Sequence, residues 1–228
     1  PMSTIKENYL KVTEQIEKAA QRSGRDPSEV KLVAVSKTVE VVKIKEAIEA
    51  GVSILGENYV QEAQKKIEEI GRIVSWHFIG HLQSNKAKYA VSLFDMIHSL
   101  DSISLAEELN RRAEKEGRTM NAMIEVNLSG EATKFGAEEA RVFDIARRVL
   151  NLSHLSLVGL MTMPPYFDDP RLSRPYYIRL RELKEKMIKE GIPLRELSMG
   201  MSNDFEIAIE EGATFVRVGT AIFGARKK

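Results

Sequence analysis

The sequence lacks three features that mark particular classes of protein. It has no cysteine, which excludes disulfides and thiolate metal sites and fits a reducing cytoplasm. Its formal net charge is only +1, so charge gives no reason to expect binding to nucleic acid or to a membrane surface. No apolar run approaches the roughly 20 residues of a membrane span, and no signal peptide opens the chain. We therefore expect a cytoplasmic protein without membrane or nucleic-acid partners.

What the sequence has is the composition of an ordinary globular protein, with 43% hydrophobic and 29% charged residues in a chain of 228. A chain of this length can bury a full core without cross-links. No linker, low-complexity tract or shift in composition marks a second domain. Pro1 before Met2 looks like a residue left by a tag-removing protease, so we expect a single domain over 2–228.

Short apolar runs alternate with longer amphipathic stretches along the chain. The capping-box pattern Thr4-x-x-Glu7, with Gly24 and Pro27 further on, predicts an N-terminal helix. Eight apolar runs predict strands, at 31–36, 52–55, 73–79, 95–99, 122–127, 155–161, 195–199 and 214–218. The stretches between them have helical spacing, at about 39–50, 58–70, 84–92, 102–116, 137–150, 171–190 and 203–211, and a last short stretch begins near Thr220.

Eight strands separated by helices predict a parallel sheet made of right-handed βαβ units. Eight is also the number of strands that closes a barrel. The predicted fold is therefore α/β, a single (β/α)₈ TIM barrel with an extra N-terminal helix. Functional side chains of such barrels lie where the strands end, so the polar residues at the predicted strand ends are the candidates for a site.

Lys37 ends the apolar run that begins at Lys31, which reads as a strand buried on both faces. A lysine at such a strand end has its stem in apolar surroundings, and partial burial favours the neutral amine, a nucleophile and Schiff-base former. The alternative is a lysine that extends from the strand end into water.

His77 and His81 lie in the polar segment Trp76–Lys86 and would share one face of a strand. Two histidines could bind a metal ion, but no third ligand at plausible spacing accompanies them, so we expect no metal site. His77 could equally be a hydrogen-bonded core residue.

Two segments near the C-terminal end suit a phosphate group. Ser202 follows a flexible glycine after the seventh predicted strand, and Gly219 and Thr220 follow the eighth. Backbone N–H groups beside hydroxyls bind phosphate, and this is a recurrent phosphate position in such barrels. The alternative is that Ser202 or Asn203 only caps a helix and that Gly219 only makes a turn.

A reactive lysine and a phosphate site in one barrel mouth suggest a phosphorylated aldehyde held as an aldimine, and pyridoxal 5′-phosphate is the obvious candidate. Arg217, from the eighth predicted strand, could face the pyridine nitrogen. A fixed cation there would disfavour protonation of the ring nitrogen, which would make the cofactor a poorer electron sink.

The chain resembles the pyridoxal phosphate homeostasis proteins, also described as YggS-like or proline-synthase co-transcribed proteins. The resemblance runs from the first helix to Gly224. Its motifs are Val33-Ala-Val-Ser-Lys-Thr38, Leu55-Gly-Glu-Asn-Tyr-Val-Gln-Glu62, Trp76-His-Phe-Ile-Gly-His-Leu-Gln-Ser-Asn-Lys86, Gly159-Leu-Met-Thr-Met163, Leu197-Ser-Met-Gly-Met-Ser202 and Val216-Arg-Val-Gly-Thr-Ala-Ile-Phe-Gly224.

The resemblance implies a barrel like the N-terminal domain of alanine racemase, with the cofactor joined to Lys37. It places Asn58 and His77 near the cofactor, and Arg217 beside its ring nitrogen. The phosphate would be held by Ser202, Gly219 and Thr220. It also matches Lys134 to a family lysine without fixing its role, whereas His81 falls at a variable position. The proline-rich loop 164–175 is read as an exposed loop, with a lid or partner surface as the alternative.

The family implies a cofactor-handling protein that binds pyridoxal phosphate and contributes to vitamin B6 homeostasis, with acceptor enzymes that use the cofactor as possible partners. The first alternative is an amino-acid racemase, which needs a base on each face of the substrate carbon. In alanine racemases a C-terminal β-domain of the partner subunit supplies one base. We find no such domain before Lys228, which favours the carrier over an enzyme and, weakly, a monomer. The second alternative is a sugar-phosphate enzyme with Glu57 or Glu125 as its base.

Overall fold

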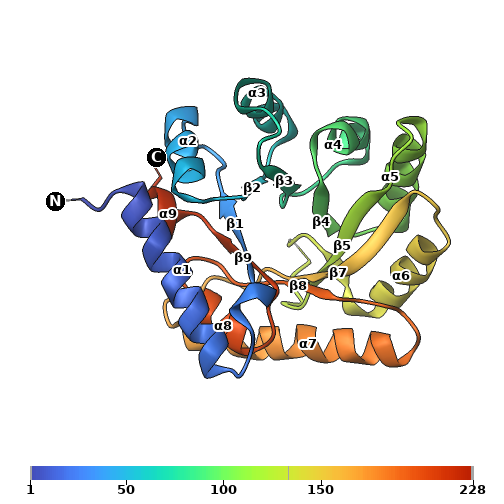
Figure 1. Cartoon of the computed structure of the whole chain (residues 1–228). Coiled ribbons are helices and arrows are strands. Elements are labelled where there is room, and N and C mark those ends of the chain that lie inside the picture. Colours follow the sequence, from blue (N-terminus) through green and yellow to red (C-terminus); the bar gives the residue numbers. More distant parts are fainter. Residues whose placement is uncertain (1, 133, 227–228) are drawn as a thin grey trace.

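The computed structural model describes residues 2–132 and 134–226, so the expected protease scar at Pro1 lies outside the described residues. Eight parallel strands of this part of the chain close into a barrel with helices around it (Figure 1), which confirms the predicted α/β barrel. The strands are β1 (Lys31–Val35), β2 (Ile54–Glu57), β3 (Ser75–Phe78), β4 (Met96–Leu100), β5 (Met120–Asn127), β7 (Leu155–Met161), β8 (Glu196–Ser198) and β9 (Phe215–Val218). The barrel closes because β1 pairs with β9 and β4 pairs with β5.

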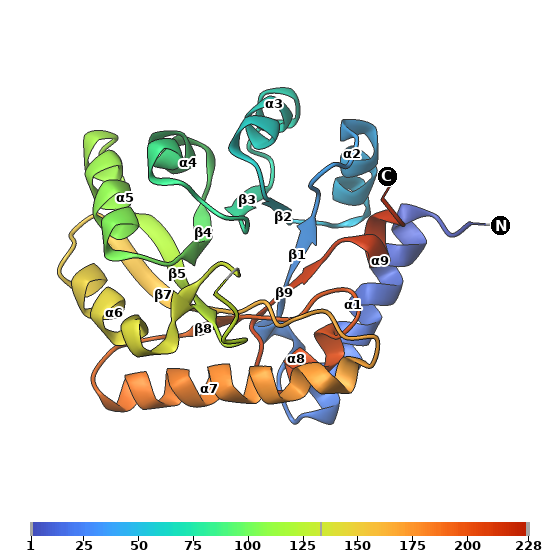
Figure 2. The same cartoon turned by 180° about the vertical axis from the view of Figure 1, so that it is seen from behind.

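The helices cover the outside of the barrel in both views (Figure 1, Figure 2). They are α1 (Ile5–Arg22), α2 (Val41–Ala50), α3 (Val60–Ile70), α4 (Ala87–Leu93), α5 (Ile103–Lys115), α6 (Val142–Leu150), α7 (Arg174–Lys189), α8 (Phe205–Glu210) and α9 (Thr220–Phe223). Within the described residues, none of the helices is both long and apolar enough to cross a bilayer.

Helix α1 is the extra helix predicted from the sequence. The Glu7 amide donates to Thr4 Oγ1 over 3.1 Å, and Glu7 Oε2 accepts from the Thr4 amide over 3.2 Å, so the capping box is formed. The helix lies beside α8 and α9 (Figure 1), and Asn8 Nδ2 donates to the carbonyl of Ile222 over 2.9 Å. The first helix therefore braces the elements that close the barrel.

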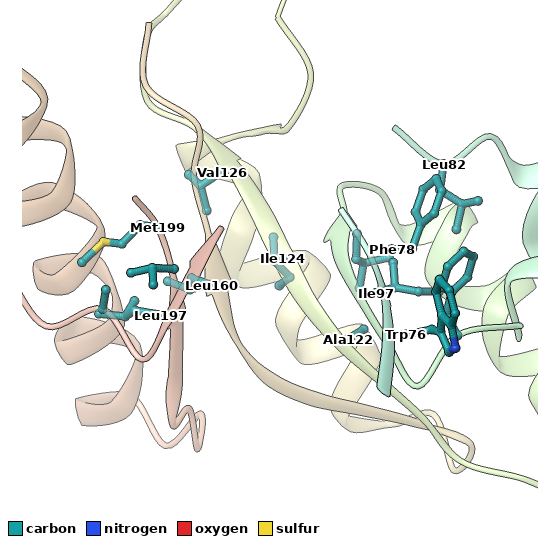
Figure 3. Close-up of a cluster of buried hydrophobic side chains, with 14 of the residues drawn as sticks. Trp76, Phe78, Leu82, Ile97, Ala122, Ile124, Val126, Leu160, Leu197 and Met199 are labelled. Atoms are coloured by element: carbon teal, nitrogen blue, oxygen red, sulfur yellow. The ribbon is translucent and has the colours of Figure 1, made fainter. Parts of the chain in front are cut away.

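The core has an outer and an inner part. The outer part lies between the strands and the helices, and Figure 3 shows a section of it around Trp76 and Phe78 of β3. The inner part fills the barrel, because alternate strand residues point inward. Its apolar layer is small and is made of Val33, Met123, Val158, Met161 and Phe215.

Several predicted boundaries are shifted by two or three residues, such as 52–55 for β2, and in two places the structure forms a different kind of element from the predicted one. The stretch 137–150 does not begin as an α-helix, because Ala137–Glu138 pairs with the end of β5 as a two-residue strand, β6, and α6 begins only at Val142. The loop predicted over 164–175 ends earlier, because Pro170–Ser173 forms a short 3₁₀ turn that leads into α7. Proline at the first positions of a helix explains this, since its missing N–H has no helical partner there.

Candidate functional site

Lys37 lies at the carboxyl end of the barrel, just after β1. The neighbouring strand is β9, with Val33 beside Arg217 and Ala34 beside Val218. A Cβ added to Gly219 would come within 3.3 Å of the Val35 side chain. Lys37 and the Gly219–Thr220 segment therefore leave adjacent strands at the same end of the barrel, as the sequence predicted.

The environment of Lys37 favours its neutral amine. Its side chain is half-buried, and burial lowers its pKa below the usual value for lysine. The positive charge of Arg226 lowers this pKa further, and the negative charge of Glu62 opposes both effects. A larger fraction of the amine is therefore unprotonated near neutral pH than in an exposed lysine.

The two phosphate-suited segments meet at Ser202. Its Oγ accepts from the amide of Gly219 over 3.3 Å and from the amide of Ala221 over 3.2 Å. The side chain of Thr220, the first residue of α9, is exposed between these two amides. The structure thus brings together the hydroxyls and amides of three predicted residues, at the start of α9.

Neither Ser202 nor Asn203 is the N-cap residue of the helix that follows them, because α8 begins at Phe205 and its N-cap residue is Asp204, which forms no side-chain cap bond. Ser202 does bond to amides at the start of another helix, α9, so its role in binding phosphate stays a prediction. Asn203 Nδ2 donates to the carbonyl of Phe167 over 2.8 Å.

The loop that carries Ser202 is held by a buried tyrosine of α7. Tyr177 Oη donates to Asp204 Oδ2 over 2.7 Å, and Asp204 Oδ1 accepts from the amide of Met201 over 2.8 Å. Burial, the first cause, and the Asp204 charge both raise the pKa of Tyr177, so it stays a protonated donor. The Tyr177 hydroxyl and the Asp204 carboxylate therefore hold residues 201–204 in place against α7.

Asn58 follows β2 and lies against the end of β3. A Cβ on Gly80 would be only 2.4 Å from the carbonyl oxygen of Asn58, so this close approach requires glycine. The Oδ1 atom of Asn58 is buried and has no hydrogen-bond partner among the described residues. A buried acceptor without a partner is costly unless a ligand supplies the donor.

Arg217 is almost fully buried inside the barrel, where its side chain is anchored by two hydrogen bonds. Nη1 donates to Ser198 Oγ over 2.7 Å and Nη2 donates to the carbonyl of Thr162 over 3.0 Å. Burial lowers its pKa, but the remaining guanidinium N–H groups still make it a donor.

His77 and His98 extend this arrangement across the barrel. His98 Nδ1 lies 2.8 Å from Ser198 Oγ, and its Nε2 lies 2.9 Å from His77 Nδ1. Arg217 can only donate, so Ser198 Oγ accepts from it, and we predict that the Ser198 hydroxyl uses its own hydrogen toward His98 Nδ1. In that arrangement His98 donates from Nε2, and His77 accepts at Nδ1 and keeps its hydrogen on Nε2. The predicted bonds then run in one direction, from Arg217 to His77.

Both histidines in this chain of bonds are neutral. Burial lowers the pKa of His77 to about 4 and that of His98 well below its usual value. The second cause for His98 is the proximity of His77, because two imidazolium ions cannot share this space. His77 is thus a hydrogen-bonded interior residue, the alternative left open by the sequence, and its contact with a cofactor stays a prediction.

Four interacting residues were missed in the sequence. His98 and Ser198 join Arg217 to His77, and Glu62 and Lys66 lie close to Lys37. His98 interrupts an apolar run, and Lys66 falls on the apolar face of α3 together with Ala63, Ile67 and Ile70. In both cases a polar residue interrupts an apolar pattern, which is the sequence signal of a buried polar contact.

The two glutamates considered as bases lie in different places. Glu57 is buried against α3, where its Oε1 is 2.6 Å from Lys66 Nζ, so it is turned away from the barrel interior. Glu125 lies inside, and burial raises its pKa to about 7, with Arg217 lowering and Asp101 raising it. Only Glu125 is available to a ligand in the mouth of the barrel.

A cavity of about 540 Å³ opens beside Glu125, lined among others by Asn58, His81, Lys86, Phe135 and Met163. Asn58 is the one predicted cofactor-binding residue in its lining, which does not include Lys37 or the Ser202–Gly219–Thr220 cluster. The His81 ring stacks on Phe135 at a centroid separation of 4.1 Å. A second hollow of about 640 Å³ lies at the amino end, lined by residues such as Tyr9 and Ser53. Function in these barrels belongs to the carboxyl end, so the first cavity is the relevant one.

Two further expectations concern Lys134 and metal binding. Lys134 lies in the loop after β5, where its carbonyl accepts from Asn127 Nδ2 over 3.4 Å, and this contact gives its side chain no role. Among residues 2–132 and 134–226, no three histidine or carboxylate side chains are grouped so that they could hold a metal ion.

The chain matches the family model described as alanine racemase, N-terminal domain, over residues 8–227. This match defines the class of barrel. The chain is also 46% identical to the pyridoxal phosphate homeostasis protein of Aquifex aeolicus (strain VF5), over 97% of this chain and 98% of that protein. The chain therefore belongs to the family of the pyridoxal phosphate homeostasis proteins, as its motifs indicated.

Solved structures agree with this assignment. An unknown protein from Bifidobacterium adolescentis is 39% identical, with a TM-score of 0.90 over 96% of this chain and 94% of that one. PipY of Synechococcus elongatus PCC7942, solved with PLP bound, is 38% identical, with a TM-score of 0.82 over 93% of this chain and 100% of that one.

Proposed function

We propose that this protein binds pyridoxal 5′-phosphate in the mouth of the barrel, holds it on Lys37 as a Schiff base, and contributes to vitamin B6 homeostasis. The observation that carries the proposal is the position of Lys37, a half-buried lysine of lowered pKa beside the Ser202–Gly219–Thr220 cluster. The PLP-bound structure of PipY and the name of the Aquifex relative support the choice of cofactor.

The described residues fit such a ligand. Ser202 and Thr220 would donate their hydroxyl hydrogens to the phosphate, and Gly219 would donate its amide hydrogen in place of its present bond to Ser202 Oγ. The buried Oδ1 atom of Asn58 has no donor, and a polar group at the edge of the cofactor ring would supply one. His77 and Arg217 would lie on the ring side, with Arg217 nearest to the ring nitrogen.

When bound, the cofactor would supply an aldehyde, and the neutral amine of Lys37 would be the group that holds it. The residues of this chain set the character of the site. Arg217 would face the ring nitrogen, where a fixed guanidinium would disfavour ring protonation and make the site poor at stabilising a carbanion. The groups that are hydrogen-bonded in series behind Arg217 are neutral, while the charges of Glu125 and Asp204 also act on Arg217. A cationic partner for the ring nitrogen suits a protein that carries the cofactor.

Further parts of the proposal rest on the sequence. We propose that the protein is a cytoplasmic monomer that passes the cofactor to enzymes requiring it. Cell fractionation tests the location, and sedimentation of the loaded protein tests the oligomeric state. Transfer is tested by mixing loaded protein with an apoenzyme and following the activity that the apoenzyme regains.

The decisive experiment is borohydride reduction of cofactor-loaded protein followed by peptide mass mapping. We expect a pyridoxyl group on Lys37 and a strongly reduced yield in Lys37→Ala. An adduct confined to another lysine, or no adduct in wild-type protein, would reject the assignment. Catalytic loss of optical purity of single amino-acid enantiomers, abolished by Lys37→Ala, would instead favour the racemase.

A further inference from the structure

The backbone at Thr38, directly after Lys37, has an unusual conformation. Its φ is 63°, and it is the one non-glycine residue with positive φ in the described part of the chain. This left-handed region is unfavourable for a β-branched side chain, and such residues persist where the surroundings hold them in place. Something must therefore hold this segment.

The segment is a turn with Lys37 at its second position. The amide of Val39 donates to the carbonyl of Ser36 over 3.0 Å, so Lys37 and Thr38 are the two central residues. A positive φ at the third position is characteristic of a type II turn, where glycine or asparagine is usual. In the commoner type I turn the central peptide faces the opposite way. The residues of the turn itself therefore do not favour the observed direction of the Lys37–Thr38 peptide.

Glu62 of α3 accepts the hydrogen bond that fixes this direction. The amide of Thr38 donates to Glu62 Oε1 over 2.7 Å, with Oε2 at 3.4 Å. In a type I turn this amide would point away from Glu62. The carboxylate of Glu62 thus compensates for the unfavourable φ of Thr38.

Glu62 is itself held by a buried lysine. Lys66 Nζ lies 2.9 Å from Glu62 Oε1 and 2.6 Å from Glu57 Oε1, and it donates to the carbonyl of Ser36 over 2.6 Å. The side chain of Lys66 is 7% exposed and that of Glu57 is fully buried. The peptide groups on both sides of Lys37 are therefore tied to one ionic cluster under the turn.

We propose that Glu62, anchored by Lys66 and Glu57, is a positioning residue that holds the Lys37 turn in the orientation needed for reaction with the cofactor aldehyde. This inference rests on the proposed function for its ligand, but the positioning itself concerns the reactivity of Lys37 toward any small aldehyde.

Glu62 can act on Lys37 by positioning its turn or by its charge, and the two roles predict opposite effects of removing Glu62 on the rate at which Lys37 reacts. The charge of Glu62 raises the pKa of Lys37, so removing the charge alone would make more free amine and speed the reaction. Removing the acceptor of the Thr38 amide frees the turn and slows the reaction. Glu62→Gln removes the charge and keeps an acceptor oxygen, whereas Glu62→Ala removes both.

The test compares the wild type with Glu62→Gln, Glu62→Ala, Thr38→Gly and the double variant Thr38→Gly/Glu62→Ala. Each protein is treated with formaldehyde and borohydride, and peptide mapping gives the labelling of Lys37 relative to the exposed Lys11. The rate of cofactor binding is followed in parallel from the absorbance of the Schiff base. Circular dichroism confirms that each variant is folded.

We expect Glu62→Ala to slow both reactions of Lys37 about tenfold, the size expected for one residue released from a strained backbone state. Glu62→Gln should react at least as fast as wild type. Glycine accepts a positive φ without strain, so in the Thr38→Gly background the loss caused by Glu62→Ala should fall to about threefold or less.

Faster labelling of Lys37 in Glu62→Ala, or the same loss in both backgrounds, would overturn the positioning role. If Glu62→Ala does not fold, the comparison of Glu62→Gln with wild type decides, because slower labelling in Glu62→Gln contradicts the inference. Failure of the proposed function looks different: wild-type protein would take up no pyridoxal phosphate, while the expected formaldehyde pattern would still support the positioning of Lys37.

Discussion

At the scale of single residues, the interior of the barrel is organised around the cation Arg217, which forms no ion pair with a carboxylate among residues 2–132 and 134–226. Arg217 donates to the Ser198 hydroxyl and to the Thr162 carbonyl, both neutral acceptors. A buried charge with neutral partners is expensive, and the two hydrogen bonds to Ser198 and Thr162 offset part of that cost. The orientation of the guanidinium is therefore set by hydrogen-bond direction and not by an ion pair.

The direction of these bonds predicts the tautomers of two histidines. His77 and His98 should both carry their hydrogen on Nε2 and stay neutral down to about pH 5, because burial depresses both pKa values. Nitrogen chemical shifts of the imidazole rings measure this, with His77→Asn and His98→Asn for assignment. In Ser198→Ala, His98 Nδ1 loses its donor, so the His98 signals should change most. A hydrogen on Nδ1 of either ring would contradict the chain of bonds.

Glu125 predicts a pH dependence of stability. Its pKa is raised to about 7 in the folded protein, above the 4.5 of an ordinary glutamate. The contribution of the neutral carboxyl to the free energy of unfolding is therefore fully present below about pH 4.5 and is lost as pH rises through about 7. Relative to wild type, Glu125→Gln should therefore gain stability between about pH 5 and 8, on the order of 2 kcal/mol.

Thermal melting of both proteins across this range measures the gain, and Glu138→Gln, at an exposed glutamate of β6, controls for the loss of a charge. A stability difference between Glu125→Gln and wild type that is independent of pH would show that the carboxyl is already ionised at pH 5.

At the scale of elements, α7 supports the loop after β8 through a single hydroxyl. Tyr177→Phe removes the donor to Asp204 and leaves a partly buried carboxylate oxygen without it, so we expect a loss of about 1–3 kcal/mol in the free energy of unfolding. The same change should weaken phosphate binding, because the loop carries Ser202. Denaturant unfolding and titration with pyridoxal phosphate measure the two effects.

Tyr176→Phe is the matched control for this variant. Tyr176 precedes Tyr177 on the same helix, is partly exposed, and its hydroxyl forms no hydrogen bond with the described residues. Equal losses in the two variants would mean that the hydroxyl bond to Asp204 contributes nothing.

Most elements could be predicted because strands and helices each leave a recognisable pattern of apolar residues in the sequence. Strands buried on both faces are continuous apolar runs, and the helices between them repeat at helical spacing. The two-residue strand β6 could not be predicted, since two residues have no period and the strand exists only because Val126 offers a partner to Ala137. The 3₁₀ turn at Pro170–Ser173 was hidden among prolines that also occur in loops.

The site could be predicted where a residue follows its own strand. Lys37, Ser202 and Gly219 lie where the strand pattern placed them. The bond between His98 and Ser198 could not be predicted, because it joins strands far apart in the sequence and depends on which residues face inward at one level of the barrel. The contact of Glu62 with the Thr38 amide likewise depends on how α3 packs on the turn.

At the scale of the whole molecule, the prediction that residues 2–228 form one domain can be tested by calorimetry. The first helix packs on α8 and α9, so the two ends of the described chain share one packing unit. We expect a single thermal transition whose calorimetric and van't Hoff enthalpies agree. Saturating pyridoxal phosphate should raise the midpoint as one transition, since a ligand of the native state stabilises the whole unit. Two separate transitions would show that the chain contains more than one domain.

The pairing of β1 with β9 has a consequence for how the protein is made. Lys37 follows the first strand and Gly219 follows the last, so the two halves of the proposed cofactor site are among the earliest and latest parts of the barrel to leave the ribosome. An incomplete nascent chain carries the reactive amine without its phosphate cradle. Tight capture of the aldehyde therefore has to wait until synthesis of the barrel is complete, and a chain stalled before β9 would hold the cofactor poorly, if at all.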